Sequence, residues 1–123
     1  MAIANLVVDN LRLQITESPE VLSIAWLGKA DQRQPRTVLA PWFDELSAHA
    51  KQQNQRLEFR FEKLEHFNSA TILALVRFVQ DLRRHQIRLL VVYDDKLQWQ
   101  KMTFDALRPF ERPDGTFELQ AAP

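Results

Sequence analysis

The spacing of hydrophobic residues changes in the middle of the chain from a strand-like period to a helical one. Apolar and polar residues alternate over Leu57–Glu62, which predicts a half-buried strand. A short segment that bears hydroxyl groups, Phe67–Thr71, follows it. The apolar residues then fall three or four apart, which predicts an amphipathic helix that runs to about His85. Its core-facing residues are expected to be Ile72, Leu75, Val76, Val79 and Leu82.

The same patterns predict seven further elements. The strands are Ile3–Val8, Leu11–Ile15, Val21–Leu27, Ile87–Tyr93 and Thr116–Leu119, and the helices are Pro41–Gln53 and Leu97–Leu107. Gly28–Asp31 is expected to end the third strand, and Pro41 is expected to be the first residue of its helix. Strands separated by helical crossovers predict a single α/β domain over residues 1–123, with a mixed, mostly parallel β-sheet and helices packed on it.

The composition restricts the possible partners and cofactors. The chain has 16 basic and 16 acidic residues, and this balance argues against binding to nucleic acid or to a membrane surface. No apolar run approaches the ~20 residues of a membrane span. The N-terminus does not resemble a signal peptide, so we expect a cytoplasmic location. Cysteine is absent and only two glycines occur, which excludes a thiolate metal site and a glycine-rich nucleotide loop, and we expect no cofactor.

The histidines do not indicate an enzyme. His49, His66 and His85 lack the spacing of a metal-binding pair. His66 lies three residues before Ser69, but the chain lacks the G-x-S-x-G elbow that would expose such a serine as a nucleophile. The histidines therefore predict neither a metal site nor a serine nucleophile activated by a histidine.

The junction before the long helix, Phe67–Thr71, is where we expect the function, and we call it the Ser69 corner. Asn68 and Ser69 stand where a helix N-cap belongs, because their side chains can accept hydrogen bonds from free N–H groups of the first turn. Asp31 and Asp94–Asp95 follow other strands, and the carboxyl ends of parallel strands carry the sites of α/β sheets. These acidic residues can therefore cluster with the corner, although each also fits an ordinary turn.

The order of these elements resembles a known family. Gly28–Asp31 follows a central strand, Phe67–Ala70 leads into the long helix, and residues 97–119 read LQWQKMTFDALRPFERPDGTFEL. This pattern, over roughly residues 20–119, resembles the STAS domain of bacterial anti-sigma-factor antagonists. It is most similar to the STAS-like branch that works with its own serine/threonine kinase and phosphatase, the SiaC type.

The resemblance implies a regulator that is not an enzyme and that works by partner switching. In such families a cognate kinase phosphorylates a hydroxyl at the start of the long helix, a phosphatase removes the phosphate, and only the unmodified form binds the effector. The common antagonist motif, Asp-Ser-Ser-Gly-Leu, has its modified serine where this chain has Ala70. In the SiaC-like pattern the hydroxyl residue directly follows an asparagine. This implies Ser69 as the phosphoacceptor, Thr71 as the alternative, and Asn68 and Asp31 as supporting residues.

Five side chains are candidates for partner contacts. Leu73, Arg77 and Phe78 fall beside the main apolar stripe of the long helix, although Leu73 and Phe78 could equally widen its buried face. Trp99 and Phe104, on the last helix, fit core packing first and a partner anchor second.

Two other classes of function remain open. The first is a STAS-like domain that senses a small molecule or nucleotide in a pocket near the strand ends. The second is a structural subunit in which the hydroxyls only cap a helix.

Overall fold

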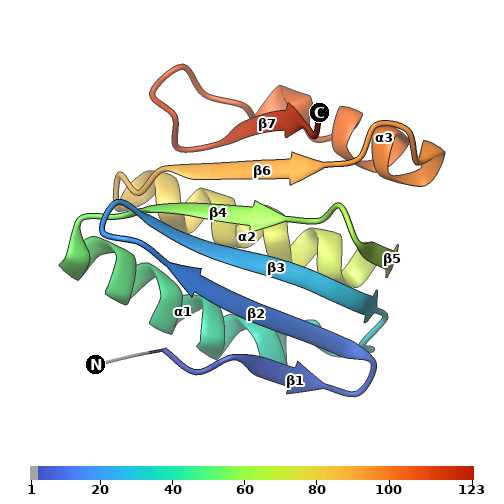
Figure 1. Cartoon of the computed structure of the whole chain (residues 1–123), viewed down its shortest axis with the longest axis horizontal. Coiled ribbons are helices and arrows are strands. Elements are labelled where there is room, and N and C mark those ends of the chain that lie inside the picture. The colour runs from blue at the N-terminus through green and yellow to red at the C-terminus, as the bar shows by residue number, and fades with distance from the viewer. Residues whose placement is uncertain (1–2) are drawn as a thin grey trace.

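The computed structural model describes residues 3–123 and contains one seven-stranded sheet (Figure 1). The strands are β1 (Leu6–Val8), β2 (Leu11–Glu17), β3 (Val21–Ala30), β4 (Arg56–Arg60), β5 (Leu64–Phe67), β6 (Leu89–Tyr93) and β7 (Glu118–Ala121). β1, β2 and β3 pair antiparallel, whereas β3, β4, β6 and β7 are parallel neighbours in that order. β5 pairs in parallel with the end of β3.

Each parallel connection needs a crossover, and helices supply these crossovers. In the described residues the helices are α1 (Pro35–Gln53), α2 (Ser69–Arg84) and α3 (Gln98–Asp105), and a 3₁₀ turn, Arg108–Phe110, follows α3. α1 and α2 lie side by side across one face of the sheet, behind the strands in Figure 1. The predicted α/β fold with a mixed, mostly parallel sheet is confirmed. No helix within residues 3–123 combines the length and the apolar character needed to cross a membrane.

Aromatic rings form the centre of the core between the sheet and the two helices. Trp26 of β3 is fully buried, and its ring centroid lies 4.8 Å from that of Phe61 and 5.6 Å from that of Phe59. Phe43 of α1 stacks on Phe78 of α2 with the centroids 4.4 Å apart. Each such pair contributes about 0.5–1.5 kcal/mol beyond the area that it buries. These contacts fix α1 and α2 against each other and against β3 and β4.

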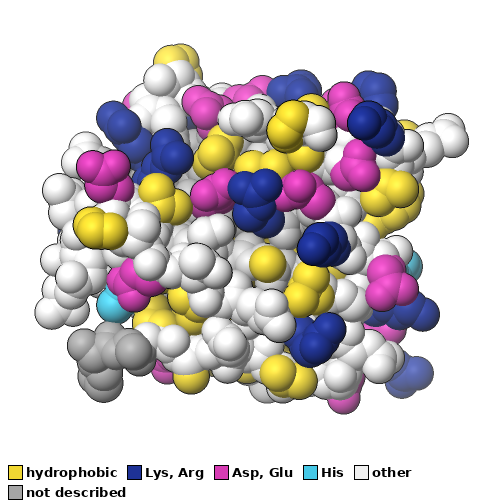
Figure 2. Space-filling model, in the orientation of Figure 1, with side chains coloured by type: hydrophobic (Ala, Val, Ile, Leu, Met, Phe, Trp, Pro, Cys, Tyr) yellow, Lys and Arg dark blue, Asp and Glu magenta, His cyan; other side chains and the backbone are white. Residues whose placement is uncertain are grey.

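No helix within residues 3–123 covers the opposite face of the sheet, and apolar and charged side chains are interspersed on it (Figure 2). On β4, Arg60 pairs with Glu58 at 2.8 Å and with Glu62 at 2.7 Å. The predicted polar side of this strand is therefore the side that faces solvent.

The start of α1 differs from the prediction. Pro41 lies inside α1, and the helix begins at Pro35, another proline that suits a first helical position. The apolar stripe of the helix extends back through Leu39, which is fully buried. Burial of this additional turn offsets the hydrogen bond that Pro41 cannot donate.

The end of β3 is the second difference. Gly28 does not end the strand. It takes a φ of 86° at a β-bulge, and the strand continues beyond the bulge to Ala30. A Cβ on Gly28 would lie 2.0 Å from the carbonyl oxygen of Asn10, so only glycine fits there. The residues beyond the bulge pair with β5, a strand too short to show a period in the sequence. β5 thus brings the chain to the carboxyl end of β3 just before α2 begins.

The outer strands are also displaced. β1 begins at Leu6 and not at Ile3, because Asn5 accepts the N–H of Ile15 through its side chain at 2.9 Å. β7 starts and ends two residues later than predicted, with Ala121 paired to Tyr93 of β6.

A polar cluster joins the end of β2 to α1. The carboxylate of Glu17 lies 2.7 Å from Nε2 of His49 and accepts a hydrogen bond from Gln55 at 2.8 Å. These hydrogen bonds, first that with His49, lower the pKa of Glu17 below its ordinary value of 4.5. A lowered folded-state pKa means that the stabilisation is complete above the unfolded value and is lost as the pH falls through the folded value.

We therefore expect Glu17→Gln to weaken the acid sensitivity of the fold. The melting temperature of the wild-type protein should fall more between about pH 6 and about pH 3 than that of the variant, because only the wild type must protonate Glu17. Thermal unfolding followed by circular dichroism measures the difference. Glu20→Gln, at an exposed turn nearby, is the control, and an identical pH profile for wild type and Glu17→Gln would contradict the assignment.

Candidate functional site

Asn68 is the N-cap of α2. Its backbone is extended, with φ of −79° and ψ of 164°, and its side-chain oxygen accepts the N–H of Thr71 at 2.8 Å. The same oxygen accepts the hydroxyl of Thr71 at 2.5 Å. Ser69 is consequently the first helical residue and not the cap. Of the two N-cap candidates in the sequence, the structure selects Asn68.

Asn68 also connects α2 to the end of β3. Its backbone N–H donates to the carbonyl of Ala30 at 2.9 Å, and its side-chain amide donates to the carbonyl of Gln32 at 2.9 Å. Gln32 is itself nearly buried and donates to the carbonyl of Val8 at 3.3 Å. The start of α2 is therefore held in place by β3 and by the loop that follows it.

The two hydroxyls of the Ser69 corner differ in access. Ser69 is exposed, and its side chain forms no hydrogen bond within residues 3–123, whereas Thr71 is fully buried under the cap. A kinase can reach Ser69 in the folded protein, but it can reach Thr71 only if the first turn of α2 opens. The first turn of α2 contains no acidic residue that would repel an added phosphate.

The two acidic candidates have different surroundings. Asp31 is exposed and directly precedes Gln32, whose carbonyl Asn68 binds, so the structure brings it next to the corner. Asp94 accepts the backbone N–H of Lys96 at 3.0 Å and closes the turn after β6. Among the described residues, neither carboxylate is hydrogen-bonded to Ser69. Asp94 thus has the ordinary turn role that its sequence context allows.

Three exposed residues follow one another along the surface of α2. Ser69, Leu73 and Arg77 are each four apart, which places them on one side of the helix, and we call them the Ser69 row. Leu73 is 50% exposed, an unusual degree for a leucine in the middle of a helix that packs on a sheet. A protein that covers Leu73 and Arg77 would also approach Ser69.

The other three candidates for partner contacts lie mainly in the core. Phe78 is buried against Phe43 and Phe59, so of its two interpretations core packing is the one observed. Phe104 is fully buried and stacks on Tyr93. Trp99 is partly buried and packs against the same core. Burial removes Phe78 and Phe104 from the surface that a partner can touch.

A groove of about 610 Å³ lies between the start of α1 and the Ser69 row. Its lining residues are Arg33, Gln34, Pro35, Arg36, Thr37 and Ala40 from the α1 side, and Ala70, Leu73, Ala74 and Arg77 from α2. Ala70 directly follows Ser69, so the groove begins at the Ser69 corner.

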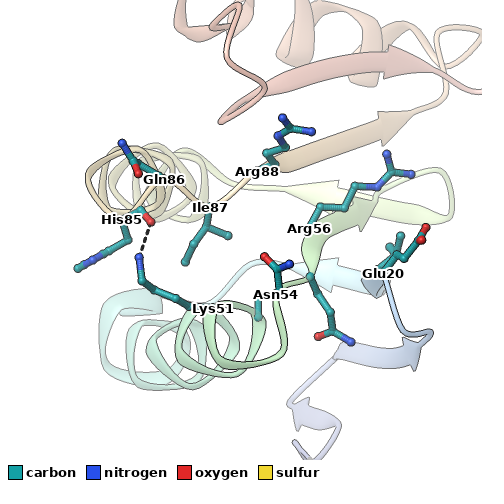
Figure 3. Close-up of a pocket in the computed structure, with 11 residues that line it drawn as sticks. Glu20, Lys51, Asn54, Arg56, His85, Gln86, Ile87 and Arg88 are labelled. Carbon is teal, nitrogen blue, oxygen red and sulfur yellow. Dashed lines mark hydrogen bonds between the residues drawn. The ribbon is translucent and has the colours of Figure 1, made fainter.

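A second hollow, of about 700 Å³, lies at the opposite end of the sheet, where β3 and β4 begin and α1 and α2 end (Figure 3). Its basic residues are Lys51, Arg56, His85 and Arg88. The ammonium of Lys51 donates to the carbonyl of His85, the C-cap residue of α2, at 2.9 Å. Helix C-termini carry partial negative charge, so basic side chains here stabilise the helix ends. Lys51 therefore has a structural explanation.

Gln100 is a residue that the sequence does not single out. It is fully buried on α3, and its amide donates to the carbonyls of Phe61 at 2.6 Å and Leu64 at 3.2 Å. Its oxygen accepts the N–H of Asp94 at 2.8 Å. Gln100 thus joins α3 to the β4–β5 connection and to the end of β6. No local signal distinguishes it from Gln98, which is exposed.

No family model matches the chain, and no curated protein matches it. Within residues 3–123, no group of three His, Asp or Glu side chains is placed to hold a metal ion. What the chain does must therefore be inferred from the Ser69 corner and the groove beside it.

The capping geometry predicts different effects for two neighbouring substitutions. Asn68→Ala should lower the free energy of unfolding by about 1–2 kcal/mol, because it removes the cap of α2 and leaves the Gln32 carbonyl without its donor. Ser69→Ala should change it by less than about 0.5 kcal/mol, as an exposed surface substitution does. Urea unfolding measures both values, and equal losses would show that Ser69 shares the capping role.

A second pair of substitutions separates core from surface on α2. Phe78→Ala should cost about 3–5 kcal/mol of unfolding free energy, because it leaves a cavity beside Phe43. Leu73→Ala should cost less than about 1 kcal/mol, because half of the Leu73 side chain already faces solvent. The same urea titrations give both values. A large loss for Leu73→Ala would mean that this side chain supports the core and is not free for a partner.

Proposed function

We propose that this chain is a STAS-like signalling regulator that is not an enzyme and acts by partner switching, with Ser69 as its phosphoacceptor. Its partners are a cognate serine/threonine kinase, a phosphatase and one effector protein in the cytoplasm. One observation carries the proposal: Ser69 is exposed at the first position of α2 while Asn68 does the capping. The cap of α2 therefore does not depend on the Ser69 hydroxyl, and this hydroxyl can carry a phosphate.

The position of Ser69 suits an added phosphate. A phosphate carries about −1.5 to −2 charges at neutral pH, and the N-terminus of a helix is electrically positive. Free N–H groups of the first turn point toward such an anion. Since no acidic residue lies in the first turn of α2, the modification does not bring like charges together there. Phosphorylation should therefore leave the fold intact.

The same phosphate changes what can dock on the helix. A partner that covers Leu73 and Arg77 also covers Ser69, because the three residues form one row. Burying a charged group against a partner that offers it no opposite charge costs on the order of 2–5 kcal/mol. This corresponds to a loss of affinity of about 30- to 4000-fold. Such a loss is large enough to release a partner without a change of fold.

The sequence resemblance supports this proposal in its order of elements and in the Asn68–Ser69 pair. The chain departs from the common antagonist motif at Ala70, which has no hydroxyl. The burial of Thr71 favours Ser69 over the alternative phosphoacceptor. The small-molecule or nucleotide sensor stays a prediction, which thermal-shift screening against nucleotides would test.

The proposal predicts that charge at position 69 controls partner binding. Mass spectrometry of the protein from its native cell should find phosphate within residues 68–72. Binding partners are captured by crosslinking to Ser69→Ala and then purified. They should bind Ser69→Ala as tightly as they bind the unmodified wild type. They should bind Ser69→Asp at least about tenfold more weakly than the unmodified wild type.

The matched control is Gln98→Asp, which places the same charge at the first residue of a different helix, α3. It should leave the dissociation constants unchanged in isothermal titration calorimetry. If Ser69→Ala and Ser69→Asp bind every captured partner equally, partner switching at Ser69 is wrong.

A further inference from the structure

The groove between α1 and α2 is bordered by a local excess of positive charge. Arg33, Arg36 and Arg77 are all exposed, and none of them forms an ion pair with another described residue. The chain as a whole has equal numbers of basic and acidic residues. Three exposed arginines around one groove give it a local positive charge that is complementary to an acidic ligand.

The floor of the groove is apolar. Leu73 is 50% exposed, and Ala40, Ala70 and Ala74 leave space beside it because their side chains are small. An exposed apolar side chain with a basic rim is typical of a protein-binding surface, in which a large apolar residue of the partner fills the centre. None of the groove residues is aromatic, so the groove lacks the stacking surface on which single-stranded nucleic acids depend.

Arg36 and Arg77 also line an adjoining hollow farther along the same pair of helices, together with Asp44 and Asp81. Arg33 lines only the part of the groove at the start of α1. Asp81 is paired with Arg84 at 2.7 Å, so only part of its charge acts on the groove. An acidic ligand is consequently favoured beside Leu73 and Arg33 over the stretch beside Asp44 and Asp81.

We propose that this groove binds an acidic, amphipathic segment of the partner protein. One large apolar side chain of that segment packs against Leu73, and its carboxylates face Arg33, Arg36 and Arg77. The identity of this segment as part of the switching partner rests on the proposed function. The chemistry of the groove does not, because it follows from charge and exposure in this chain.

Ser69 lies where it can control this site. It precedes Leu73 by one helical turn on the same side of α2, and its neighbour Ala70 lines the groove. A phosphate on Ser69 would repel the carboxylates of the segment and compete with them for the arginines. One modification would thus weaken binding in two ways.

A random peptide library displayed on phage, selected on the immobilised protein, tests the chemistry without knowledge of the partner. The expected binders carry a net negative charge and at least one Leu, Ile, Phe or Trp. In ¹⁵N NMR spectra they should shift the amides of residues 33–40 and 70–77. Enrichment of neutral or basic peptides, shifts confined to other surfaces, or no enrichment at all would each overturn the proposal.

Charge reversal then tests the arginines. Arg36→Glu/Arg77→Glu should weaken the selected peptides by at least about tenfold, and raising the salt concentration should weaken them for the wild type as well. The control is Arg12→Glu/Arg56→Glu, which changes the net charge equally at exposed positions outside the groove and should retain binding. Equal losses of peptide affinity for both variants would mean that only the net charge of the protein matters, and this would overturn the proposal. Competition by a short single-stranded oligonucleotide at lower concentration than the peptide would assign the groove to nucleic acid instead, and it too would overturn the proposal.

These measurements distinguish a failure of this inference from a failure of the proposed function. If the peptides occupy the groove but every captured partner binds Ser69→Ala and Ser69→Asp equally, the groove stands and switching at Ser69 fails. If Ser69→Asp releases the captured partner while Arg36→Glu/Arg77→Glu does not, switching stands and the groove assignment fails. The expected result is that both variants weaken the selected peptides and the captured partner, Ser69→Asp by about fivefold or more for the peptides.

Discussion

The hydrogen bonds of Asn68 are the constraint on which the arrangement of the site depends. One side chain caps α2 through Thr71 and binds the loop after β3 through Gln32, while its backbone N–H pairs with Ala30. The start of α2 is thereby fixed at the carboxyl end of β3. The Gly28 bulge contributes to the same geometry, because it carries β3 on to Ala30 and lets β5 pair with it. Ser69 directly follows Asn68, but its side chain takes no part in these hydrogen bonds.

That division of labour explains how the proposed modification of Ser69 can act without unfolding the protein. Because Asn68 supplies the cap, a change at Ser69 leaves the capping hydrogen bond to Thr71 in place. The phosphate would then meet the positive end of α2 and a surface with Arg33, Arg36 and Arg77. Electrostatic control of this kind needs no second conformation of the chain. It needs only a partner whose own charges face the same groove.

Much of the fold could be predicted from local pattern, because the pattern follows from which side of an element is buried. The alternation over Leu57–Glu62 predicted β4, which ends two residues earlier at Arg60, and the helical spacing after Ile72 predicted α2. Phe78 lies beside the main stripe in sequence, yet it is buried because Phe43 of α1 stacks on it. Its burial depends on a neighbouring helix, and no periodicity within α2 reveals that neighbour. The short strand β5 was missed for a related reason, since only its pairing with β3 defines it.

By itself, the sequence determined the class of fold, the long helix, and the hydroxyl-bearing corner that precedes it, because each depends on residues close together in the chain. It located the helix cap at Asn68 or Ser69 but could not choose between them, since both side chains accept hydrogen bonds. Tertiary structure made that choice, because the amide of Asn68 can also donate to Gln32 across the sheet edge and the hydroxyl of Ser69 is left exposed. It also buried Thr71 and brought Arg33 and Arg36 beside Arg77. These relations join residues more than thirty positions apart, and only packing of α1 and α2 on one sheet places them together.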